Sequence, residues 1–350
     1  MKRALELATR SVGNASPNPM VGAVLVHEGR IIGEGWHREY GTAHAEVNCL
    51  ESVADADRHL VSESTMYVNL EPCAHHGKTP PCALRLVQEK VRRVIVANED
   101  PFEQVDGKGF EILKSHHIYT EQGVLEKQGL WLNRRFFCFH QRKRPYIILK
   151  WAQTPEGYFA PLDRSRYPIT GTDSRQLLHK WRTEESAILV GYQTALNDNP
   201  ELTARMYTGR QPLRIVFDRT LQLPRTHHVF SSAAPTWIIN AGVEGEEGNI
   251  RFVQINFSDN PLTQILEKLY DANRLSLIVE GGAVLLESFI REGLWDEARV
   301  FTGQASMSEG VHAPLLTNFK KAFDAGVGGD RLNVYVNKDS KYKYVAGMEL

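Results

Sequence analysis

A histidine, a glutamate and two cysteines lie at spacings that could form a hydrolytic metal site. Glu46 follows His44 by two residues, and Cys73 and Cys82 each follow a proline. Zinc prefers imidazole nitrogen and thiolate sulfur, and three protein ligands leave the fourth tetrahedral position for a water molecule. The metal lowers the pKa of that water, so a hydroxide nucleophile becomes available near neutral pH. We therefore expect His44, Cys73 and Cys82 to bind one Zn2+ ion.

The expected role of Glu46 is proton transfer. It is too close to His44 in sequence to share its helix face at the usual spacing of three or four residues, so one side chain can bind metal while the other reaches the substrate. In zinc deaminases a glutamate that does not bind the metal acts as the general acid and base. A structural zinc site would need a fourth ligand, for which His75 and His76 are the nearest candidates, and it would have no use for this glutamate. The pattern favours hydrolytic deamination.

The segment between the two cysteines is longer than the Pro-Cys-x-x-Cys spacing of nucleic-acid and nucleoside deaminases. It carries His75 and Lys78, two cationic or hydrogen-bonding groups that would lie beside the metal. Such a segment fits a small substrate that bears a phosphate. The alternative is a surface loop without a binding role.

Composition indicates two domains and no attraction for polyanions. The chain of 350 residues is long enough for two cores. Its 41 lysines and arginines nearly cancel 42 aspartates and glutamates, so no global field would attract nucleic acid or an anionic membrane. Thiolate ligands indicate a reducing compartment, and Cys49 and Cys138 are expected to be buried apolar residues. With no signal peptide and no apolar run of spanning length, we expect a cytoplasmic protein.

Strands and helices alternate along the first part of the chain. A helix is expected over residues 3–12, and strands over residues 21–26, 65–70 and 93–97. Thr42 is expected to cap the helix that carries His44 and Glu46. The run Thr79-Pro80-Pro81-Cys82 resembles a helix start, with a capping threonine and a proline at the first helical position. The alternation predicts a three-layer α/β domain that ends near residue 140.

A second alternating series follows the basic run Gln141-Arg142-Lys143-Arg144, which we interpret as a solvated linker and not as a nucleic-acid contact. Strands are expected over residues 146–151, 187–190, 213–217, 236–240, 275–280 and 298–301, and helices over residues 174–182, 262–270 and 283–291. The sequence therefore predicts two α/β domains, over residues 1–143 and 144–350.

These motifs together resemble the bifunctional deaminase/reductases of riboflavin biosynthesis. In the first half, the matching residues are 16–24, His37 with Gly41, 44–46, 71–73 and 79–82. In the second half they are Lys150, 169–171, Arg182, 188–191, 197–200 with Leu202, Thr203 and Arg205, and 279–282. The resemblance spans roughly residues 1–300, and its amino-terminal motifs are the more specific ones.

The resemblance implies two consecutive reactions. The first domain, similar to cytidine deaminases, would hydrolyse the 2-amino group of 2,5-diamino-6-(5-phosphoribosylamino)pyrimidin-4(3H)-one. The second domain, similar in fold to dihydrofolate reductase, would use NADPH to reduce the ribosyl group and give 5-amino-6-(5-phosphoribitylamino)uracil. Carried over by position, Glu46 is the proton shuttle, and the pyrimidine and its phosphoribosyl arm are held by Asn18, His37, His75 and Lys78.

For the reductase the resemblance implies a substrate set and a cofactor set. The substrate set is Arg182, Leu202, Arg205 and Glu280, and the NADPH set is Lys150, Gln153, Pro168, Thr170, Gly191, Thr194, Asp198, Arg219, Gly281 and Gly282. These roles are physically reasonable, since two arginines can clamp a phosphate and a glycine pair before a helix lets the backbone approach a pyrophosphate. Arg219 could pair with a 2′-phosphate, although an exposed arginine is equally ordinary there. No G-x-G-x-x-G fingerprint follows a strand, so these residues alone do not predict a nicotinamide site.

Three alternatives stay open. Thr154-Pro155-Glu156-Gly157 departs from the family's Ser-Leu-Asp-Gly, which motivates a monofunctional deaminase with a degenerate reductase domain. An editing-type nucleoside or transfer-RNA deaminase is opposed by the long segment between Cys73 and Cys82 and by the neutral net charge. A zinc-stabilised interaction module is opposed by Glu46. We expect a small phosphoribosylated substrate, no nucleic-acid or membrane partner, and a homo-oligomer.

Overall fold

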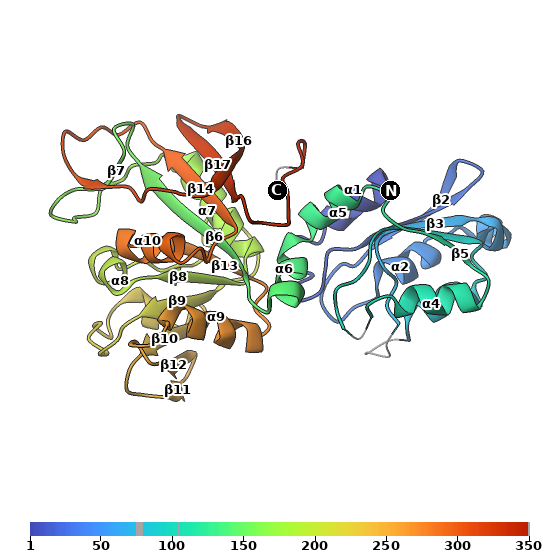
Figure 1. Cartoon of the computed structure of the whole chain (residues 1–350), viewed down its shortest axis with the longest axis horizontal. Coiled ribbons are helices and arrows are strands. Elements are labelled where there is room, and N and C mark those ends of the chain that lie inside the picture. Colours follow the sequence, from blue (N-terminus) through green and yellow to red (C-terminus); the bar gives the residue numbers. More distant parts are fainter. Residues whose placement is uncertain (75–79, 104, 349–350) are drawn as a thin grey trace. The chain divides into compact units, whose positions relative to one another are not determined.

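The chain divides into two compact units in the computed structural model, which describes residues 1–74, 80–103 and 105–348 (Figure 1). The first unit comprises Met1–Arg142 with Tyr342–Leu350, and the second comprises Lys143–Lys341. The division lies one residue from the expected domain boundary, and the tail is grouped with the first unit. Within the described residues, no helix has both the length and the apolar content needed to cross a membrane.

The first unit is built on a five-stranded sheet. The strand order is β2 (Arg30–Trp36), β1 (Gly22–His27), β3 (Thr65–Leu70), β4 (Arg93–Asn98) and β5 (Tyr119–Glu121). Strand β1 pairs antiparallel with β2 and β3, whereas β3, β4 and β5 run parallel. The helices are α1 (Lys2–Thr9), α2 (Ala45–Glu51), α3 (Cys82–Gln88), α4 (Lys108–Ser115), α5 (Glu126–Leu132) and α6 (Arg134–Arg142), with a 3-10 segment η1 (Asp55–Glu63).

Helices cover both faces of this sheet. Successive strand residues point to opposite faces, so Val24 packs with residues of α1, whereas Ala23 and Leu25 pack with residues of α2, α3 and α4. Helix α5 contacts both α1 and β4, on the α1 side. The expected three-layer α/β architecture is confirmed.

Two expected helix starts were wrong. The Thr42 hydroxyl donates to the Glu39 carbonyl at 2.7 Å, and helix α2 begins at Ala45 with His44 as its N-cap residue. Helix α3 begins at Cys82, and Pro81 is its N-cap rather than its first helical residue. Thr79 lies outside the described residues. In both cases a zinc-ligand candidate stands at the first turn, which brings its donor atom close to the other helix start.

Strand β2 was not predicted from the sequence because glycines weaken its strand pattern. A Cβ atom on Gly35 would lie 2.2 Å from the backbone nitrogen of Cys49, so helix α2 packs against the strand backbone itself. Gly33 lies against the same helix, where a Cβ atom would be 2.6 Å from the Cys49 carbonyl oxygen. These two glycines set the position of the helix that carries Glu46.

The second unit contains a ten-stranded sheet. The strand order is β11 (Gly245–Glu247), β12 (Ile250–Gln254), β10 (Thr236–Asn240), β9 (Leu213–Phe217), β8 (Ala187–Val190), β13 (Ser276–Gly281), β6 (Tyr146–Gln153), β14 (Glu297–Thr302), β17 (Asp330–Asn337) and β16 (Phe319–Val327). From β12 to β14 the strands run parallel, and β11, β17 and β16 pair antiparallel. The carboxyl ends of the parallel strands therefore lie at one edge, where α/β sheets bind ligands.

The remaining elements connect these strands. They are α7 (Thr172–Glu184), α8 (Tyr192–Asp198), α9 (Pro261–Asp271), α10 (Ala283–Arg291), the 3-10 segment η2 (His228–Phe230) and a small ladder of β7 (Tyr158–Ala160) with β15 (Val311–His312). Buried residues of α9 and α10, such as Leu266 and Phe289, form the core with alternate residues of the central strands. All six strands and all three helices expected for this part are present, with slightly different ends.

The basic run is not simply a solvated linker. Helix α6 extends to Arg142, and Arg144 forms a bidentate ion pair with the buried Asp296 at 2.6 and 3.0 Å. The prediction of a solvated linker was wrong for Arg144, because its guanidinium binds the buried carboxylate of Asp296, directly before β14. Cys49 and Cys138 are buried, as expected.

Candidate active sites

His44, Cys73 and Cys82 come together between the starts of helices α2 and α3. The Nδ1 atom of His44 lies 3.5 Å from Cys73 Sγ and 3.3 Å from Cys82 Sγ, and all three donor atoms lie within 4.8 Å of one another. Tetrahedral zinc with the usual bond lengths of about 2.0 Å to nitrogen and 2.3 Å to sulfur separates such atoms by about 3.6 Å. The donor set and its spacing fit one Zn2+ ion with a fourth position for water.

A hydrogen bond joins the two thiols, so the pKa of one falls while that of the other rises. The pKa of Cys73 is lowered to about 4, chiefly by the hydrogen bond from the Cys82 thiol, with further bonds from His44 and the Cys82 backbone N–H, the last at 3.2 Å. The pKa of Cys82 is raised, because its thiol donates this hydrogen bond and is buried. The site is thus organised to hold negative charge on sulfur, which a divalent cation would neutralise.

Glu46 is buried in the first turn of α2, beside the cysteines. Burial, together with the nearby charge of Cys73, raises the pKa of its carboxyl group to about 7. A carboxyl group with a pKa near neutrality can both accept and donate a proton, as a general acid and base must. Its surroundings therefore suit the role predicted for it.

Asn18 and His37 lie next to the metal cluster. The Asn18 amide nitrogen is 3.1 Å from His37 Nε2, and His37 Nδ1 is 3.2 Å from the Ala43 carbonyl oxygen. The His37 ring also packs edge-on against the His44 ring, with centroids 5.3 Å apart. Burial lowers the pKa of His37, so a neutral ring can donate from Nδ1 and accept from the asparagine. His75 and Lys78, the other two predicted substrate residues, lie outside the described residues.

Glu71 supports this site and was not identified from the sequence. Its buried carboxylate accepts hydrogen bonds from the backbone N–H groups of Asp100, Gly107, Gly109 and Phe110, at 3.2, 3.1, 2.8 and 3.4 Å. These bonds hold the start of α4 against the strand end that leads to Cys73. The sequence signal was a glutamate directly before Pro72, but its partners are distant in sequence.

In the second unit, four residues of the predicted cofactor set meet at the carboxyl edge of the sheet. The Gly191 N–H donates to the Gly281 carbonyl at 3.1 Å, and a Cβ atom on Gly281 would lie 3.1 Å from Thr194 Cγ2. Gly282 is the N-cap residue of α10 and has a φ of 82°, which favours glycine. This close approach of two helix starts leaves backbone N–H groups near the edge, which suits a pyrophosphate.

The other predicted cofactor residues lie around this edge or on the segments that follow it. Gln153 ends β6, Asp198 ends α8, and Pro168 and Thr170 flank Ile169, whose carbonyl oxygen would lie 1.9 Å from a Cβ atom on Gly303. Burial raises the pKa of Asp198.

Three charged side chains of the predicted sets form one buried cluster. Arg182 donates from Nε and a terminal nitrogen to the two carboxylate oxygens of Glu280, at 2.9 and 2.7 Å. Lys150 lies near both, and burial lowers the pKa of its ammonium group, while Glu280 acts in the opposite direction. The guanidinium of Arg182 is thus engaged by a carboxylate, whereas Arg205 is half-exposed and 3.6 Å from Glu201. Of the two arginines, Arg205 is the more accessible to a substrate phosphate.

Arg219 lies two strands away from the glycine pair along the same edge. Its guanidinium lies 5.5 Å from the ring centroid of Phe257. Both residues line an open cavity of about 780 Å3 whose other charged residues are Glu244, Glu267, Lys268 and Asp271. The cavity places a cation and an aromatic face within reach of a ligand that extends along the edge.

The departure at Thr154-Pro155-Glu156-Gly157 forms an ordinary turn. The Gly157 N–H donates to the Thr154 carbonyl at 3.0 Å, and proline occupies the second position, which suits its fixed φ. The Glu156 carboxylate accepts a hydrogen bond from the Ser306 hydroxyl at 2.8 Å. The substitution by proline is therefore compatible with this backbone.

The fold and the two sites define a zinc-dependent deaminase domain joined to a reductase domain in one chain. Residues 1–98 match the cytidine and deoxycytidylate deaminase zinc-binding region, and residues 145–305 match the RibD C-terminal domain. The chain belongs to the RibD family of riboflavin-biosynthesis enzymes.

Individual relatives agree with this assignment over most of their length. The riboflavin biosynthesis protein RibD of Aquifex aeolicus is 40% identical over 89% of this chain and 88% of that protein, and the RibD of Bacillus amyloliquefaciens is 36% identical over 86% and 82%. A solved structure from Thermotoga maritima, described as a diaminohydroxyphosphoribosylaminopyrimidine deaminase/5-amino-6-(5-phosphoribosylamino)uracil reductase, superimposes with a TM-score of 0.87. It is 33% identical and the match covers 96% of this chain and 97% of that one.

Proposed function

We propose that this chain catalyses two successive steps of riboflavin biosynthesis. The first unit would deaminate 2,5-diamino-6-(5-phosphoribosylamino)pyrimidin-4(3H)-one by hydrolysis, and the second would reduce the ribosyl group of the product to a ribityl chain with NADPH. The observation that carries the proposal is the presence in one chain of two built sites: a His-Cys-Cys cluster with a buried glutamate, and a charged cluster beside a glycine-lined sheet edge. The activities named for the Thermotoga maritima protein are the same pair.

In the deaminase, His44, Cys73 and Cys82 would hold Zn2+, which when bound supplies an acidified water. Glu46 would accept a proton from the attacking water and donate a proton to the departing nitrogen, so that ammonia leaves and a carbonyl replaces the amine. Asn18 and the neutral His37 would hold the pyrimidine beside His44. His75 and Lys78 would contact the phosphoribosyl arm.

In the reductase, NADPH, when bound, would supply a hydride to C1′ of the ring-opened sugar. The backbone at Gly191, Gly281 and Gly282 would hold the pyrophosphate, and Arg219 would contact the 2′-phosphate. Arg205 would bind the substrate phosphate, with Leu202 beside the substrate. Arg182 and Glu280 would orient the ribose through their fixed pair.

The finer setting of these reactions is part of the proposal. The enzyme would act in the cytoplasm as a homo-oligomer on a free small molecule, without a nucleic-acid or membrane partner. The nearly balanced charge of 41 basic and 42 acidic residues supports the absence of polyanionic partners. Sedimentation at several protein concentrations would determine the oligomeric state.

Transfer of isotope from the cofactor tests the proposal. NADPH that carries deuterium at the transferred position should place the label at C1′ of the ribityl product, as read by NMR and mass spectrometry. Label in the pyrimidine ring, or unlabelled product, would contradict the proposed reduction. The alternative of a monofunctional deaminase predicts no labelled product at all.

A further inference from the structure

The segment that carries Leu202 and Arg205 has an unusual backbone. Asn199 and Leu202 both have positive φ values, 40° and 55°, although neither is glycine, and Leu202 is also buried. Asparagine adopts this conformation readily at a helix end, and Asn199 is the C-cap of α8, but a buried leucine rarely does so unless its surroundings impose it. Something outside the segment must therefore hold it.

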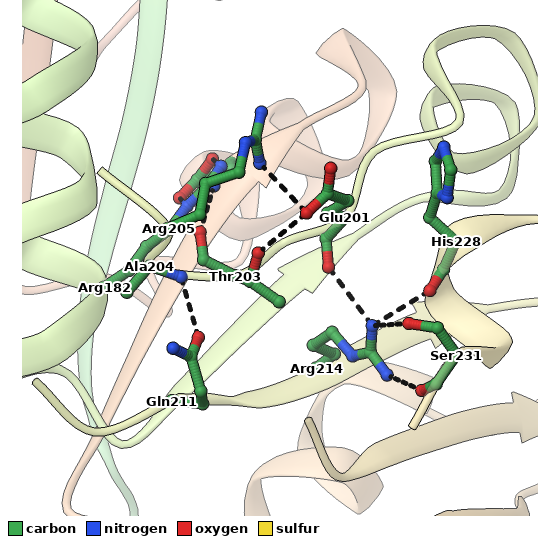
Figure 2. A network of polar contacts seen from close by, with 10 residues as sticks. Arg182, Glu201, Thr203, Ala204, Arg205, Gln211, Arg214, His228 and Ser231 are labelled. Carbon is green, nitrogen blue, oxygen red and sulfur yellow. Dashed lines mark hydrogen bonds and ion pairs between the residues drawn. The ribbon is translucent and has the colours of Figure 1, made fainter. Parts of the chain in front are cut away.

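Three side chains from outside the segment bind its backbone (Figure 2). Arg182 donates to the Thr203 carbonyl at 2.9 Å, and the Gln211 side-chain oxygen accepts the Ala204 N–H at 2.8 Å. Arg214 donates to the Glu201 carbonyl at 3.3 Å. Two peptide groups of the segment, Glu201–Leu202 and Thr203–Ala204, are thus fixed by side chains of α7, of the segment before β9, and of β9 itself.

Arg214 is itself held rigidly. It is fully buried on β9, and its terminal nitrogens also donate to the carbonyl oxygens of His228, Ser231 and Ala234, at 3.0, 2.6 and 2.6 Å. Neutral carbonyl groups therefore surround the buried cation, and each of these bonds would have to break for it to move. Figure 2 shows this arginine between Glu201 on one side and His228 and Ser231 on the other.

We infer that Gln211 and Arg214 are positioning residues of the reductase substrate site. They hold the strained segment in the conformation that presents Arg205 to the substrate phosphate, and neither needs to touch the substrate. The inference rests on the proposed function, since it assumes that Arg205 binds that phosphate.

The variant Gln211→Leu tests the inference with little risk to folding, because Gln211 is exposed. Loss of one hydrogen bond to the segment should raise the KM for the reductase substrate by about three- to tenfold, with a smaller change in kcat. The preference for the phosphorylated over the dephosphorylated substrate should fall by a similar factor, which general destabilisation would not cause. The deaminase rate of the same protein, which belongs to the other unit, should stay unchanged.

Arg214→Met should shift the same two quantities further, and Arg299→Met is its matched control. Arg299 is equally buried in the second unit, but it is paired with Glu185 and Glu297 and lies over the ring of Trp181. Arg299→Met should lower stability while leaving the KM within about twofold, a change below that of one hydrogen bond. If Arg214→Met fails to fold, Gln211→Leu alone decides.

Arg205→Met separates the inference from the proposed function. If Arg205→Met leaves the KM unchanged, the proposed substrate set is wrong and the inference falls with it. If Arg205→Met raises the KM but Gln211→Leu leaves both the KM and the phosphate preference unchanged, only the positioning role is rejected.

Discussion

Arg182 of helix α7 and Glu280 of strand β13 form a bidentate ion pair directly before the glycine pair at the sheet edge. Their side chains are 9% and 6% exposed, so the pair is buried, and Arg182 also binds the Thr203 carbonyl. One arginine therefore links the strand end that leads into the predicted cofactor edge with the segment that carries the predicted substrate residues.

Removing one partner of this pair should lower the free energy of unfolding more than removing both partners. Arg182→Met leaves a buried carboxylate without its partner, which should lower the free energy of unfolding by about 3 kcal/mol. The double variant Arg182→Met/Glu280→Leu should recover only part of that loss, because Lys150 then loses the nearby carboxylate, and neither variant should reduce substrate at the normal rate. Denaturant unfolding measures the free energy of unfolding of each variant. The control is Arg225→Met, which breaks an exposed pair with Glu247 and should lower the free energy of unfolding by less than about 1 kcal/mol. Equal losses in the single and double variants would contradict this account.

Glu46→Gln should separate metal binding from catalysis. The amide keeps the shape of the side chain but cannot transfer protons, so ammonia release should fall by about 100-fold or more while the bound zinc stays near one per chain. Zinc is measured by atomic absorption and ammonia by a coupled assay. Glu51→Gln, at the exposed end of the same helix, should behave as the unmodified enzyme. A deaminase rate within a few-fold of normal in Glu46→Gln would remove the glutamate from the mechanism.

Acidification should weaken the second unit through His179. This side chain of α7 is 4% exposed, and its pKa is lowered from 6.5 to about 4, first by burial and then by Arg182 and Arg205, with Glu280 acting in the opposite direction. The unfolded chain takes up a proton at higher pH than the folded one, so stability is full above pH 6.5 and declines as the pH falls toward 4. Hydrogen exchange of the β13 amides at pH 7 and pH 5 should show the decline, and His179→Asn should reduce it. An unchanged pH dependence in the variant would assign the effect to other groups.

Arg219 should set the preference for NADPH over NADH. Arg219→Met should raise the KM for NADPH by about tenfold, because a charge-assisted bond to the 2′-phosphate is lost, and leave the KM for NADH nearly unchanged. Arg291→Met, which removes an exposed arginine of helix α10, is the control. Equal changes for both cofactors would show that Arg219 does not recognise the 2′-phosphate.

Much of the fold followed from local patterns. The central parallel strands are continuous apolar runs because both faces are buried, so their positions could be predicted within a few residues. Strand β2 was not predicted because Gly33 and Gly35, which let α2 approach, weaken its strand pattern. The hairpin of β16 and β17 was not predicted because β16 is an edge strand that is mostly exposed and so lacks an apolar pattern.

The residues of the candidate sites also divide into those that could be predicted from the sequence and those that could not. His44, Cys73, Cys82 and Glu46 could be selected from the sequence because zinc chemistry restricts both residue type and spacing. Glu71, Gln211 and Arg214 could not, because their roles consist of bonds to backbone groups, and backbone groups leave no signature in the sequence. Such residues become visible only when the chain is folded.

The most direct test follows ammonia release and NADPH oxidation in one reaction, with zinc-loaded protein and the diaminopyrimidine substrate generated in situ. Ammonia should appear first, and NADPH oxidation should follow it. In the Glu46→Gln variant, NADPH oxidation should be lost and should return when the deaminated product is added. Ammonia release with NADPH untouched, or NADPH oxidation without prior deamination, would contradict two successive reactions in this chain.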